Sequence, residues 1–572
     1  MIRFVSALCI TLVLLLAAYS VEAATYTVTK IADTNDGTCD ADCSLREAVV
    51  AANTSADNDV VAFALPLFSA PQTITLSGTD IIIANNGSLA IFGPGANRLT
   101  ISGNNTSRIL TTSVGVVGSL SGVRMTAGNG VSTVQTGRGG AFYNNGGNFT
   151  LTNVVIAGNS AANGGGLNNA GTATLTIVNS VLSGNTATGA GGAMQNFSGN
   201  TMNIINSTVS GNTCNSTITG GGAIQANGTL TVTNSTFSAN TAAGGDGGAF
   251  YYNGQGLIMT NTTIVGNTAT GGGSGGLHKS TSTLNANVRN TIIAGNTGAP
   301  SPDAVGIFNS QGNNIIQTIG TSTGWVALDQ QNVNPLLAPL GFYGGFGMTH
   351  FPLAVSPAIN AGQNCVTDLS CSAANPPIAV TTDERGVSRP AGATVDIGAV
   401  EASGAYVAVL PSATAGTPYA FTLVPATNGF MYLLDLGSLG GITLSTSTSA
   451  TLGGTAPVAG VFSDQIQIVG PPGQATHSYR INVLQDPNIL SVSGRVATNA
   501  GGVVGKAFVV LTGLNGQTYR AVPGPLGYFR IEGVPAGLNG TLTVVTKEGP
   551  AFSPRPIAVT DVIDNLELRA LP

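Results

Sequence analysis

The sequence predicts an all-β protein: a right-handed parallel β-helix with a helical cap at its N-terminal end, followed by two β-sandwich modules. Three observations lead to the solenoid. A repeat recurs with a period of about 27 residues, which is typical of solenoids. Its segments alternate apolar and polar residues as strands do. Gly and Asn interrupt these segments where turns are needed.

Each copy of the repeat carries two markers. The first is a short segment that begins and ends with Asn, as in Asn153–Asn159, Asn206–Asn212 and Asn290–Asn296. The second is a Gly-Gly pair before a small or apolar residue, as in Gly221–Ala223. Glycine lets the backbone turn sharply and pack closely. A copy of about 27 residues makes one three-sided coil, and such coils stack at roughly 4.8 Å.

The segments between the markers are short and rich in β-branched residues, as in Thr174–Val178 and Thr229–Thr233. Helical repeats need longer amphipathic segments rich in Ala, Leu, Glu and Lys. The pattern therefore favours strands over helices throughout the repeat.

The repeated Asn is assigned a structural role at a corner of the coil, in preference to ligand binding. Asn tolerates the left-handed conformation that a corner needs, and stacked amides can hydrogen-bond into a ladder. The corner residues are Asn159, Asn185, Asn212, Asn240, Asn267 and Asn296.

Two motifs of the repeat resemble those of a known family. Gly221–Ile224 reads Gly-Gly-Ala-Ile, and Phe237–Asn240 reads Phe-Ser-Ala-Asn. These look like the GGAI and FxxN repeats of chlamydial polymorphic membrane proteins. The resemblance implies a β-helical surface adhesin.

The composition is typical of an extracellular β-rich protein. Charged residues make up only 8% of the chain, whereas about a quarter is usual. Thr, Ser and Asn are expected to cover the surface in place of charge. The formal net charge of −6 favours neither a nucleic-acid partner nor an anionic membrane.

Residues 1–23 are predicted to be a secretory signal. Arg3 supplies the positive start, Phe4–Ala18 the apolar core, and Val21–Ala23 a cleavage site. The alternative is an uncleaved membrane anchor. No later run approaches the ~20 apolar residues of a membrane helix, so no transmembrane segment is expected after removal of the signal. The predicted location is secreted or at the cell surface.

The cysteines predict two small disulfide loops, because close pairs in a secreted chain are usually bridged. The pairs are Cys39 with Cys43 and Cys365 with Cys371. Cys214 is left over, as an unpaired buried residue or a surface thiol. The chain has only three histidines, none spaced with a Cys pair, which argues against a zinc site.

Residues 24–57 are predicted to begin with a strand at Thr25–Thr29 and to continue into a short helix at Ser44–Asn53. Ser44 and Glu47 fit a capping box. A short amphipathic helix before a solenoid suits a cap, since the end coil must be shielded. Cys43–Ala48 reads Cys-Ser-Leu-Arg-Glu-Ala and resembles the motif that names the CSLREA domain. The resemblance implies an N-terminal cap on an exported bacterial β-helix.

The loop between strand and helix is acidic. Two interpretations stand: a solvated, disulfide-tied loop, which we favour, or a Ca²⁺ site, since Ca²⁺ takes several carboxylate oxygens. Otherwise no cofactor is predicted. The acidic residues are Asp33, Asp36, Asp40 and Asp42.

Residues 58–300 continue as coils, and the whole solenoid, roughly residues 25–400, is expected to have on the order of a dozen coils. Residues 301–402 end it. Ser356–Gly362, Thr382–Gly386 and Val395–Glu401 occur there in order. This series resembles the choice-of-anchor Q domain of bacterial surface proteins.

Polar side chains concentrate in this last segment. One interpretation is a catalytic or metal site. The other, which we favour, is an Asp–Arg network that closes the last coil, because buried charges occur when they are paired. The residues are His350, Asp383, Arg385, Asp396 and Glu401.

The two C-terminal regions are predicted to be β-sandwiches. Residues 403–486 have short alternating strands at regular turn spacing, and Leu410–Tyr419 and Leu452–Ala456 resemble Ig-like modules of bacterial surface proteins. Residues 487–572 contain Gly505–Leu511 and Val534–Gly537. They resemble the carboxypeptidase regulatory-like domain, a prealbumin-type sandwich without a protease centre. The linker is placed at residues 485–487.

The sparse charge argues against polysaccharide chemistry in the regular coils. Glycosidases and lyases need paired carboxylates, or Ca²⁺ with a basic residue. Between Arg98 and Pro300 the only acidic residue is Asp246. Aromatic residues could stack on sugars there, although packing between coils is favoured. They are Phe142, Tyr143, Phe250, Tyr251 and Tyr252.

Three hypotheses follow for function. The first is a non-enzymatic adhesin or scaffold that binds extracellular glycans or proteins, with the two sandwich modules behind a β-helical stalk. The second is a polysaccharide lyase or glycoside hydrolase acting from the β-helix. The third is a structural coat component.

Overall fold

The computed structural model describes residues 24–571 with short gaps. The predicted signal at residues 1–23 and the predicted linker at residues 485–487 lie outside the described residues. The internal gaps are residues 65, 85–86, 219, 255, 281–284, 372–375, 404–405, 416, 436–437, 447, 457–458, 472, 485–488, 505–506, 514–516 and 547–550.

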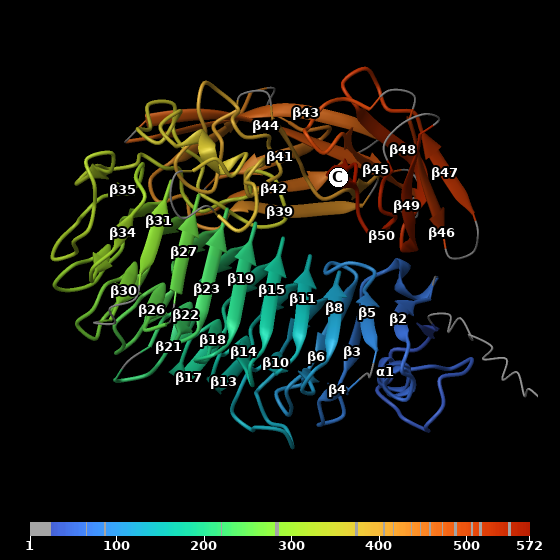
Figure 1. Cartoon of the computed structure of the whole chain (residues 1–572). Helices are drawn as coiled ribbons and strands as arrows, with labels where there is room; N and C mark the ends of the chain where they lie inside the picture. Colours follow the sequence, from blue (N-terminus) through green and yellow to red (C-terminus); the bar gives the residue numbers. More distant parts are fainter. Residues whose placement is uncertain are drawn as a thin grey trace, which may run out of the picture.

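The chain up to residue 331 winds into a parallel β-solenoid, which confirms the predicted fold class in its main feature (Figure 1). Three long sheets run along its axis, with 11, 9 and 11 strands, and a fourth has five. We call them sheets 1 to 4. Neighbouring strands come from successive turns and pair in parallel. Sheet 2 has one strand from each of nine turns, so the expected dozen coils was an overestimate.

The strands of the solenoid have the following bounds. Sheet 1 contains β1 (Thr25–Val28), β2 (Asn58–Phe63), β5 (Ser88–Phe92), β8 (Val117–Ser121), β11 (Asn148–Thr152), β15 (Thr174–Val178), β19 (Thr201–Ile205), β23 (Thr229–Thr233), β27 (Gly256–Thr260), β31 (Ala286–Arg289) and β34 (Asn309–Ser310). Sheet 2 contains β4 (Ile81–Ile83), β7 (Leu110–Thr112), β10 (Phe142–Asn145), β14 (Leu167–Ala170), β18 (Met194–Asn196), β22 (Ile224–Ala226), β26 (Phe250–Tyr252), β30 (Leu277–Lys279) and β33 (Ala304–Val305). Sheet 3 contains β3 (Gln72–Thr75), β6 (Leu99–Ser102), β9 (Arg124–Thr126), β12 (Val155–Ala157), β16 (Val181–Ser183), β20 (Thr208–Ser210), β24 (Thr236–Ser238), β28 (Thr263–Val265), β32 (Ile292–Ala294), β35 (Ile315–Ile316) and β36 (Gln330–Gln331). Sheet 4 contains β13 (Ser160–Asn163), β17 (Thr186–Ala190), β21 (Thr213–Cys214), β25 (Thr241–Ala242) and β29 (Thr268–Ala269).

Alternate side chains of each strand enter the solenoid and stack on the same position of the next turn. Met202 of β19 lies in register with Leu230 of β23, which lies in register with Leu257 of β27. All three are fully buried in one apolar cluster that runs through the coils. This repeated burial is what holds a solenoid together, since each turn covers the apolar face of the next.

The two Asn residues of each repeat have different roles. The opening residue takes the left-handed conformation, as in Asn153 (φ 53°) and Asn234 (φ 56°). The closing residue forms a ladder: Asn185 Nδ2 donates to Asn212 Oδ1 at 2.9 Å. Both properties had been predicted for the closing residue, but at that corner the left-handed residue is usually the preceding glycine, as in Gly184 (φ 60°).

The Asn ladder runs without interruption through six turns. Each side chain donates to the next, and the last one, Asn296, donates to the carboxylate of Asp303 at 2.9 Å. The main-chain amide of each turn also donates to the neighbouring side chain, as Asn185 N does to Asn212 Oδ1. The ladder thus satisfies buried polar groups along the whole corner.

The helix predicted at residues 44–53 is α1 (Leu45–Asn53). Ser44 Oγ accepts from Glu47 N at 3.0 Å, and Glu47 Oε2 accepts from Ser44 N at 2.7 Å, which makes a capping box. Leu45, Ala48 and Val49 are buried in the solenoid cluster. The helix lies at the N-terminal end of the coils (Figure 1).

The solenoid ends earlier than expected. Its last strand is β36, whereas the coils had been predicted to continue to about residue 400. We call residues 333–402 the flank segment. Among its described residues, which leave out 372–375, the one named element is the short 3₁₀ helix Asn364–Val366. The segment turns back and lies against the outer face of sheet 3, where Ala399 N donates to Thr263 Oγ1 at 2.9 Å. It covers the side of the solenoid and does not close its end.

The C-terminal third forms two pairs of sheets. The first pair has β37 (Val407–Val409), β38 (Ala413–Thr414), β40 (Met431–Leu434), β43 (Gly460–Gly470) and β44 (Gly473–Leu484) in one sheet, and β39 (Pro418–Val424), β41 (Ile442–Ser445) and β42 (Ala450–Thr455) in the other. The second pair has β45 (Ile489–Ala497), β48 (Tyr528–Pro535) and β51 (Ile563–Arg569) in one sheet, and β46 (Ala507–Gly513), β47 (Thr518–Ala521), β49 (Leu538–Thr546) and β50 (Arg555–Val559) in the other. The first pair shares a buried apolar cluster with the flank segment, which contributes Tyr343 and Leu353, and the second pair has a separate one.

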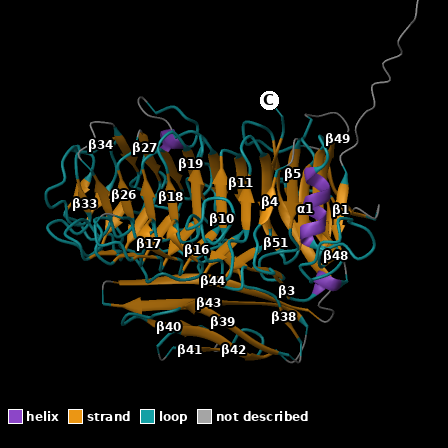
Figure 2. Ribbon diagram, turned by 90° about the horizontal axis from the view of Figure 1, so that it is seen from below, coloured by secondary structure: helices purple, strands orange, loops and turns teal. Residues whose placement is uncertain are grey.

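Both C-terminal regions fold back along the solenoid. In Figure 2 the long strands β43 and β44 run lengthwise beside the coils and cross the direction of the coil strands. The second region reaches the first turns, where Asn97 Nδ2 donates to Asp561 Oδ2 at 3.3 Å and Asn539 Nδ2 to Phe63 O at 3.4 Å. The expected arrangement placed both modules behind a β-helical stalk, whereas in the structure both regions lie beside the coils.

Both predicted disulfides are present, between Cys39 and Cys43 and between Cys365 and Cys371. Cys214 is free and buried, and burial raises the pKa of its thiol. The surface-thiol alternative for this residue is therefore wrong. Among the described residues no helix is long and apolar enough to cross a membrane.

Candidate functional site

The polar cluster predicted in residues 301–402 is assembled in the structure, but it is buried. All five side chains belong to the flank segment, where it lies against sheet 3. Relative exposure is 7% or less for each of them: His350, Asp383, Arg385, Asp396 and Glu401.

Two ion pairs form the centre of this cluster. Arg385 donates to Asp383 Oδ2 through Nε at 2.9 Å and through Nη2 at 2.7 Å. Glu401 pairs with Arg389, a residue that the sequence analysis did not single out. Arg389 also donates to Asn234 Oδ1 of the solenoid at 3.0 Å. The favoured interpretation, an Asp–Arg network, describes these contacts, although the network lies on the side of the coils and not at their end.

Glu384 is the residue of this region that sequence reasoning missed. Thr208 donates to its Oε1 at 3.0 Å, and Thr236 and Thr349 donate to its Oε2. Burial raises the pKa of Glu384 to about 8, against the effect of these hydrogen bonds. Thr208 and Thr236 occupy the same outward position on consecutive turns, so the repeat itself builds the hydroxyl pair that receives the carboxyl group.

His350 is held in the same interface. Its Nδ1 lies 2.9 Å from Ala338 O and its Nε2 lies 2.9 Å from Ser238 Oγ. Because a carbonyl only accepts, Nδ1 carries the proton and Nε2 accepts from the serine in the neutral ring. Burial lowers the pKa of His350 to about 4.

These groups resemble an active site in their pKa values but not in their surroundings. Burial and the nearby charge of Glu401 raise the pKa of Asp396 to about 6, and shifts of this kind are common in catalytic groups. Structural networks cause them as well. Here each carboxylate or imidazole is bonded to the protein and hidden from solvent. The arrangement can fix the flank segment on the solenoid, but it leaves no reacting atom within reach of a substrate.

Four of the five aromatic residues suggested for sugar stacking are buried, three of them inside the solenoid and Tyr143 on the outer face of sheet 2. Phe142 and Phe250 are buried, as are Tyr143 and Tyr252. Sugar stacking is therefore wrong for these four. Period-two alternation turns Phe142, Phe250 and Tyr252 inward, and the Arg108 guanidinium lies over the Tyr143 ring. Tyr251 points outward from β26 and is half-buried.

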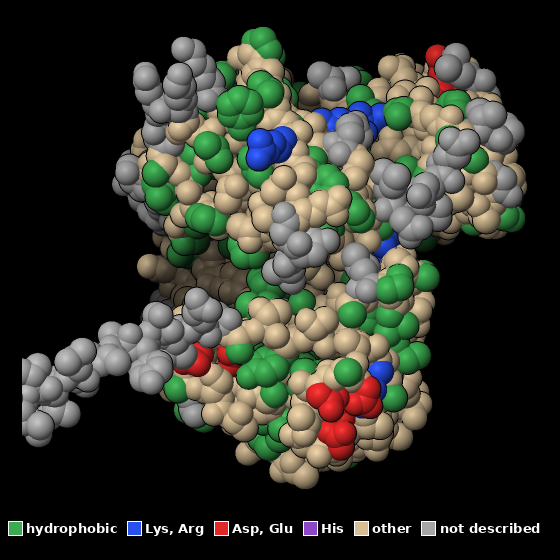
Figure 3. Space-filling model, turned by 90° about the vertical axis from the view of Figure 1, so that its right-hand side faces the viewer, with side chains coloured by type: hydrophobic (Ala, Val, Ile, Leu, Met, Phe, Trp, Pro, Cys, Tyr) green, Lys and Arg blue, Asp and Glu red, His purple; other side chains and the backbone are tan. Residues whose placement is uncertain are grey.

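Two carboxylates of the acidic loop form ion pairs within the protein. Asp33 accepts from Arg46 Nε and Nη2, both at 2.8 Å, and Asp42 pairs with Lys30 at 3.0 Å. Figure 3 looks onto the end of the molecule that carries this loop and shows acidic side chains gathered there. The described residues contain no group of three or more His, Cys, Asp or Glu that could hold a metal ion. Asp36, Asp40 and Asp42 are exposed, the Cys39–Cys43 disulfide ties the loop, and the Ca²⁺ site stays the alternative interpretation.

A second polar array, missed in the sequence analysis, lies on the outer face of sheet 2. It is formed by the middle residues of successive strands, which stack in register, and we call it the sheet 2 row. Its members are Tyr143, Asn168, Gln195, Gln225, Tyr251 and His278. Strand alternation could have located it, since each member follows the Gly-Gly marker by two or three residues.

The two ends of the sheet 2 row differ. At one end the guanidinium of Arg108 lies over the Tyr143 ring at 4.9 Å, and Asn168 Nδ2 donates to Gln195 Oε1 at 2.8 Å. These members are nearly fully buried. At the other end Gln225, Tyr251 and His278 are half-buried. This half-exposed end is the part of the row that can meet a ligand.

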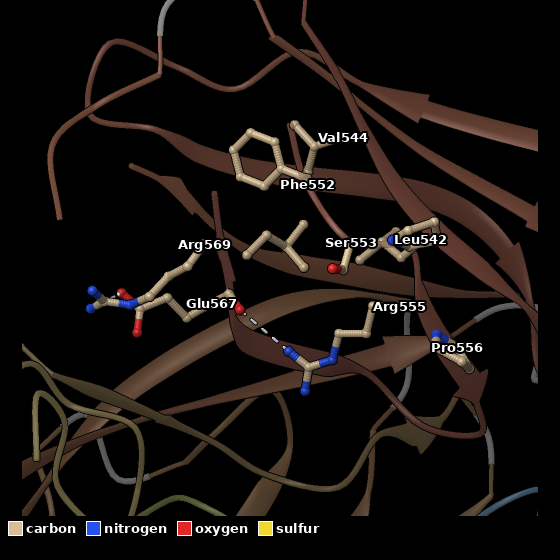
Figure 4. A pocket seen from close by; sticks show the side chains of 10 residues that line it. Leu542, Val544, Phe552, Ser553, Arg555, Pro556, Glu567 and Arg569 are labelled. Atoms are coloured by element: carbon tan, nitrogen blue, oxygen red, sulfur yellow. Dashed lines mark hydrogen bonds and ion pairs between the residues drawn. The ribbon is translucent and has the colours of Figure 1, made fainter. Parts of the chain in front are cut away.

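A pocket of about 270 Å³ lies in the last region, between β49, β50 and β51 (Figure 4). Leu542, Val544 and Phe552 give it an apolar lining. Its charged groups are engaged with each other or with the backbone: Arg569 pairs with Glu567 at 2.8 Å, and Arg555 donates to Glu567 O at 3.3 Å.

No family model matches this chain, and no curated protein matches it either. Two solved structures of an endo-fucoidan hydrolase from glycoside hydrolase family 107 are similar at 17% identity and a TM-score of 0.13, over 28% of this chain and 28% of the hydrolase. The Bacillus anthracis TIE protein is similar at 13% identity and a TM-score of 0.12, over 28% of this chain and 39% of that one. At such scores these likenesses assign neither family nor activity.

Proposed function

We propose that this chain is an exported bacterial protein, secreted or held at the cell surface, whose solenoid is a non-enzymatic scaffold for binding extracellular glycans or proteins. The proposal rests on the residue composition of the coils, which have almost no acidic side chains and many uncharged polar ones. Between Arg98 and Pro300 the sequence has one acidic residue, Asp246, and the outer faces carry Thr, Ser, Asn and Gln. Such a surface can hydrogen-bond to many hydroxyl groups but lacks the paired carboxylates of a glycosidase.

The finer assignments belong to the same proposal. Residues 1–23 act as a signal, and α1 of the CSLREA-like region shields the first turn. The flank segment corresponds to the choice-of-anchor Q-like part. The two pairs of sheets are sandwich modules, Ig-like and carboxypeptidase regulatory-like. Folded back along the coils, they brace one side of the solenoid and leave sheet 1 open to the viewer in Figure 1.

Binding of the secreted chain, residues 24–572, to a panel of immobilised glycans and matrix proteins tests the proposal. We expect saturable binding that survives moderate salt, because uncharged hydrogen-bonding groups dominate the coil surface. Folded protein that binds no member of the panel would count against it. Ordered self-assembly without ligand would favour a coat component instead.

The enzymatic alternative has its own assay. Incubation with pectin, alginate and related polymers, followed by detection of new reducing ends or unsaturated products, is expected to show no turnover. Turnover that disappears in Asp383→Ala or Asp396→Ala would place chemistry in the buried cluster and would contradict the scaffold proposal.

A further inference from the structure

We propose that the half-exposed end of the sheet 2 row is a binding site for a neutral glycan, formed by Gln225, Tyr251 and His278. This inference rests on the proposed function and names the site and the ligand class for it. None of the three belongs to the buried cluster of the flank segment, so the site is separate from the network that holds that segment.

The fold places the three side chains in a line. Gln225 pairs in register with Tyr251, and Tyr251 with His278, on consecutive strands of sheet 2. The residues on either side of Tyr251, Phe250 and Tyr252, are buried in the solenoid interior. Neighbouring strands lie about 4.8 Å apart, so the line spans roughly 10 Å. It is long enough to contact more than one ring of an extended chain.

Polar atoms of this line lack partners within the protein. Gln225 Oε1 and His278 Nδ1 are hidden from solvent and make no hydrogen bond. Further along the row, Asn168 Oδ1 is unpartnered as well, on a side chain that is fully buried. Buried polar atoms are nearly always paired. Both side chains are half-exposed, so a change of rotamer brings the unpartnered atom to the surface. There a ligand hydroxyl can donate to Gln225 Oε1 and, with the ring nitrogen unprotonated, to His278 Nδ1.

An aromatic surface accompanies these atoms. The rings of Tyr251 and His278 stack with centroids 5.4 Å apart and an interplanar angle of 27°. A half-exposed aromatic face can pack against the C–H face of a sugar ring while neighbouring polar groups bond its hydroxyls. The line thus combines two stacked rings, a phenol and an imidazole, with one amide. These are groups suited to binding carbohydrate.

The charge around the line selects against acidic polymers. Asp246 is the one acidic residue between Arg98 and Pro300, and its charge acts on both Tyr251 and His278. Burial lowers the pKa of His278, so the ring is neutral at pH 7. A polyanion would meet a carboxylate with no cation in the line to offset it. The ligand class is therefore a neutral glycan.

The test measures the affinity of the full secreted chain for a panel of hexasaccharides. The neutral probes are cellohexaose, laminarihexaose, chitohexaose and mannohexaose, and the anionic ones are hexamers of galacturonate and of mannuronate. We expect at least one neutral probe to bind and the anionic probes to bind more weakly. Tyr251→Ala should reduce the affinity by about tenfold or more, since it removes the stacking surface.

Further variants separate the site from general damage to the fold. His278→Ala and Gln225→Glu should also weaken binding, the latter with little change of shape. Tyr251→Phe keeps the ring and should retain most of the affinity. Thr176→Ala, on the outer face of sheet 1, is the matched control and should bind as the unaltered chain does. Circular dichroism and thermal unfolding check that each variant folds.

The outcomes distinguish this site from the general proposal. Neutral probes that bind the Tyr251, His278 and Gln225 variants as tightly as the control would overturn the site and leave the scaffold function standing. Tighter binding of the anionic probes would overturn the ligand class. A folded chain that binds neither glycans nor matrix proteins would overturn both.

Discussion

The outer faces of sheet 2 and sheet 3 are made by the same repeat but have different surroundings. On sheet 3, Thr208 and Thr236 donate to Glu384, and Ser238 bonds His350. The flank segment covers these groups and completes their hydrogen bonds. On sheet 2, Gln225 and His278 each retain an unpartnered atom.

The repeat alone does not determine which outer face of the solenoid is covered by other parts of the protein. The flank segment determines it, because it turns back over sheet 3. The covered face uses its polar groups to hold charge from the flank segment, whereas sheet 2 keeps unpartnered polar atoms on the half-exposed side chains of Gln225 and His278. Binding is therefore expected on sheet 2.

The largest expected effect is at the covered face. Asp383→Ala would leave Arg385 buried without its carboxylate and would also remove the acceptor of Glu401 N. Breaking a buried pair in this way costs about 3–5 kcal/mol. Denaturant unfolding would measure the loss. Glu567→Ala, which breaks a partly exposed pair with Arg569, is the control and should cost less than about 1 kcal/mol.

Equal costs for the two variants would mean that the flank network contributes no more than a surface pair. In that case the covered face would contribute no more to the free energy of unfolding than an exposed face does.

A second prediction concerns pH and Glu384. Its pKa is raised to about 8 in the folded chain, so its stabilising contribution is full below its ordinary pKa near 4.5 and is lost as pH rises toward 8. Glu384→Gln keeps the shape and removes this ionisation. The variant should therefore unfold at a higher temperature than the unaltered chain at pH 8, with the difference shrinking at pH 5.

The midpoint of thermal unfolding at several pH values decides this point. His350→Gln does not touch that carboxyl group and serves as a comparison. The pKa of His350 is lowered to about 4, so its contribution is lost as pH falls from about 6.5 toward 4, the opposite direction. A pH dependence that Glu384→Gln leaves unchanged would contradict the assignment.

The smallest effect is expected on sheet 2. Gln225→Ala should change the free energy of unfolding by less than about 1 kcal/mol, because Gln225 Oε1 has no protein partner to lose. Chemical unfolding beside Asp383→Ala gives the contrast directly. A loss as large as that of Asp383→Ala would show that Gln225 is structural and would weaken the case for a binding face.

Local periodicity predicted much of this architecture. The spacing of Asn and Gly pairs was enough to predict a solenoid, and the close Cys pairs were enough to predict both disulfides. Alternation also contained the information that Tyr251 faces outward while Phe250 and Tyr252 face inward. The prediction favoured packing between coils for Phe250, Tyr251 and Tyr252 alike, and so did not separate the outward Tyr251 from the two inward residues.

The position of the flank segment could not be predicted in this way. Glu384 meets Thr236 across 148 residues of chain, and no local pattern records such a contact. The same holds for Asn97 and Asp561, which bring the last region back to the first turns. Without these contacts, the charged residues near the end of the solenoid were assigned to closing its last coil.

Hydrogen exchange of the full chain, with and without the neutral hexasaccharide that binds most tightly, tests the contrast between the two faces most directly. The account predicts added protection at β22, β26 and β30 and none at β20, β24 or residues 383–401. Protection confined to the flank segment and sheet 3, with sheet 2 unchanged, would contradict it.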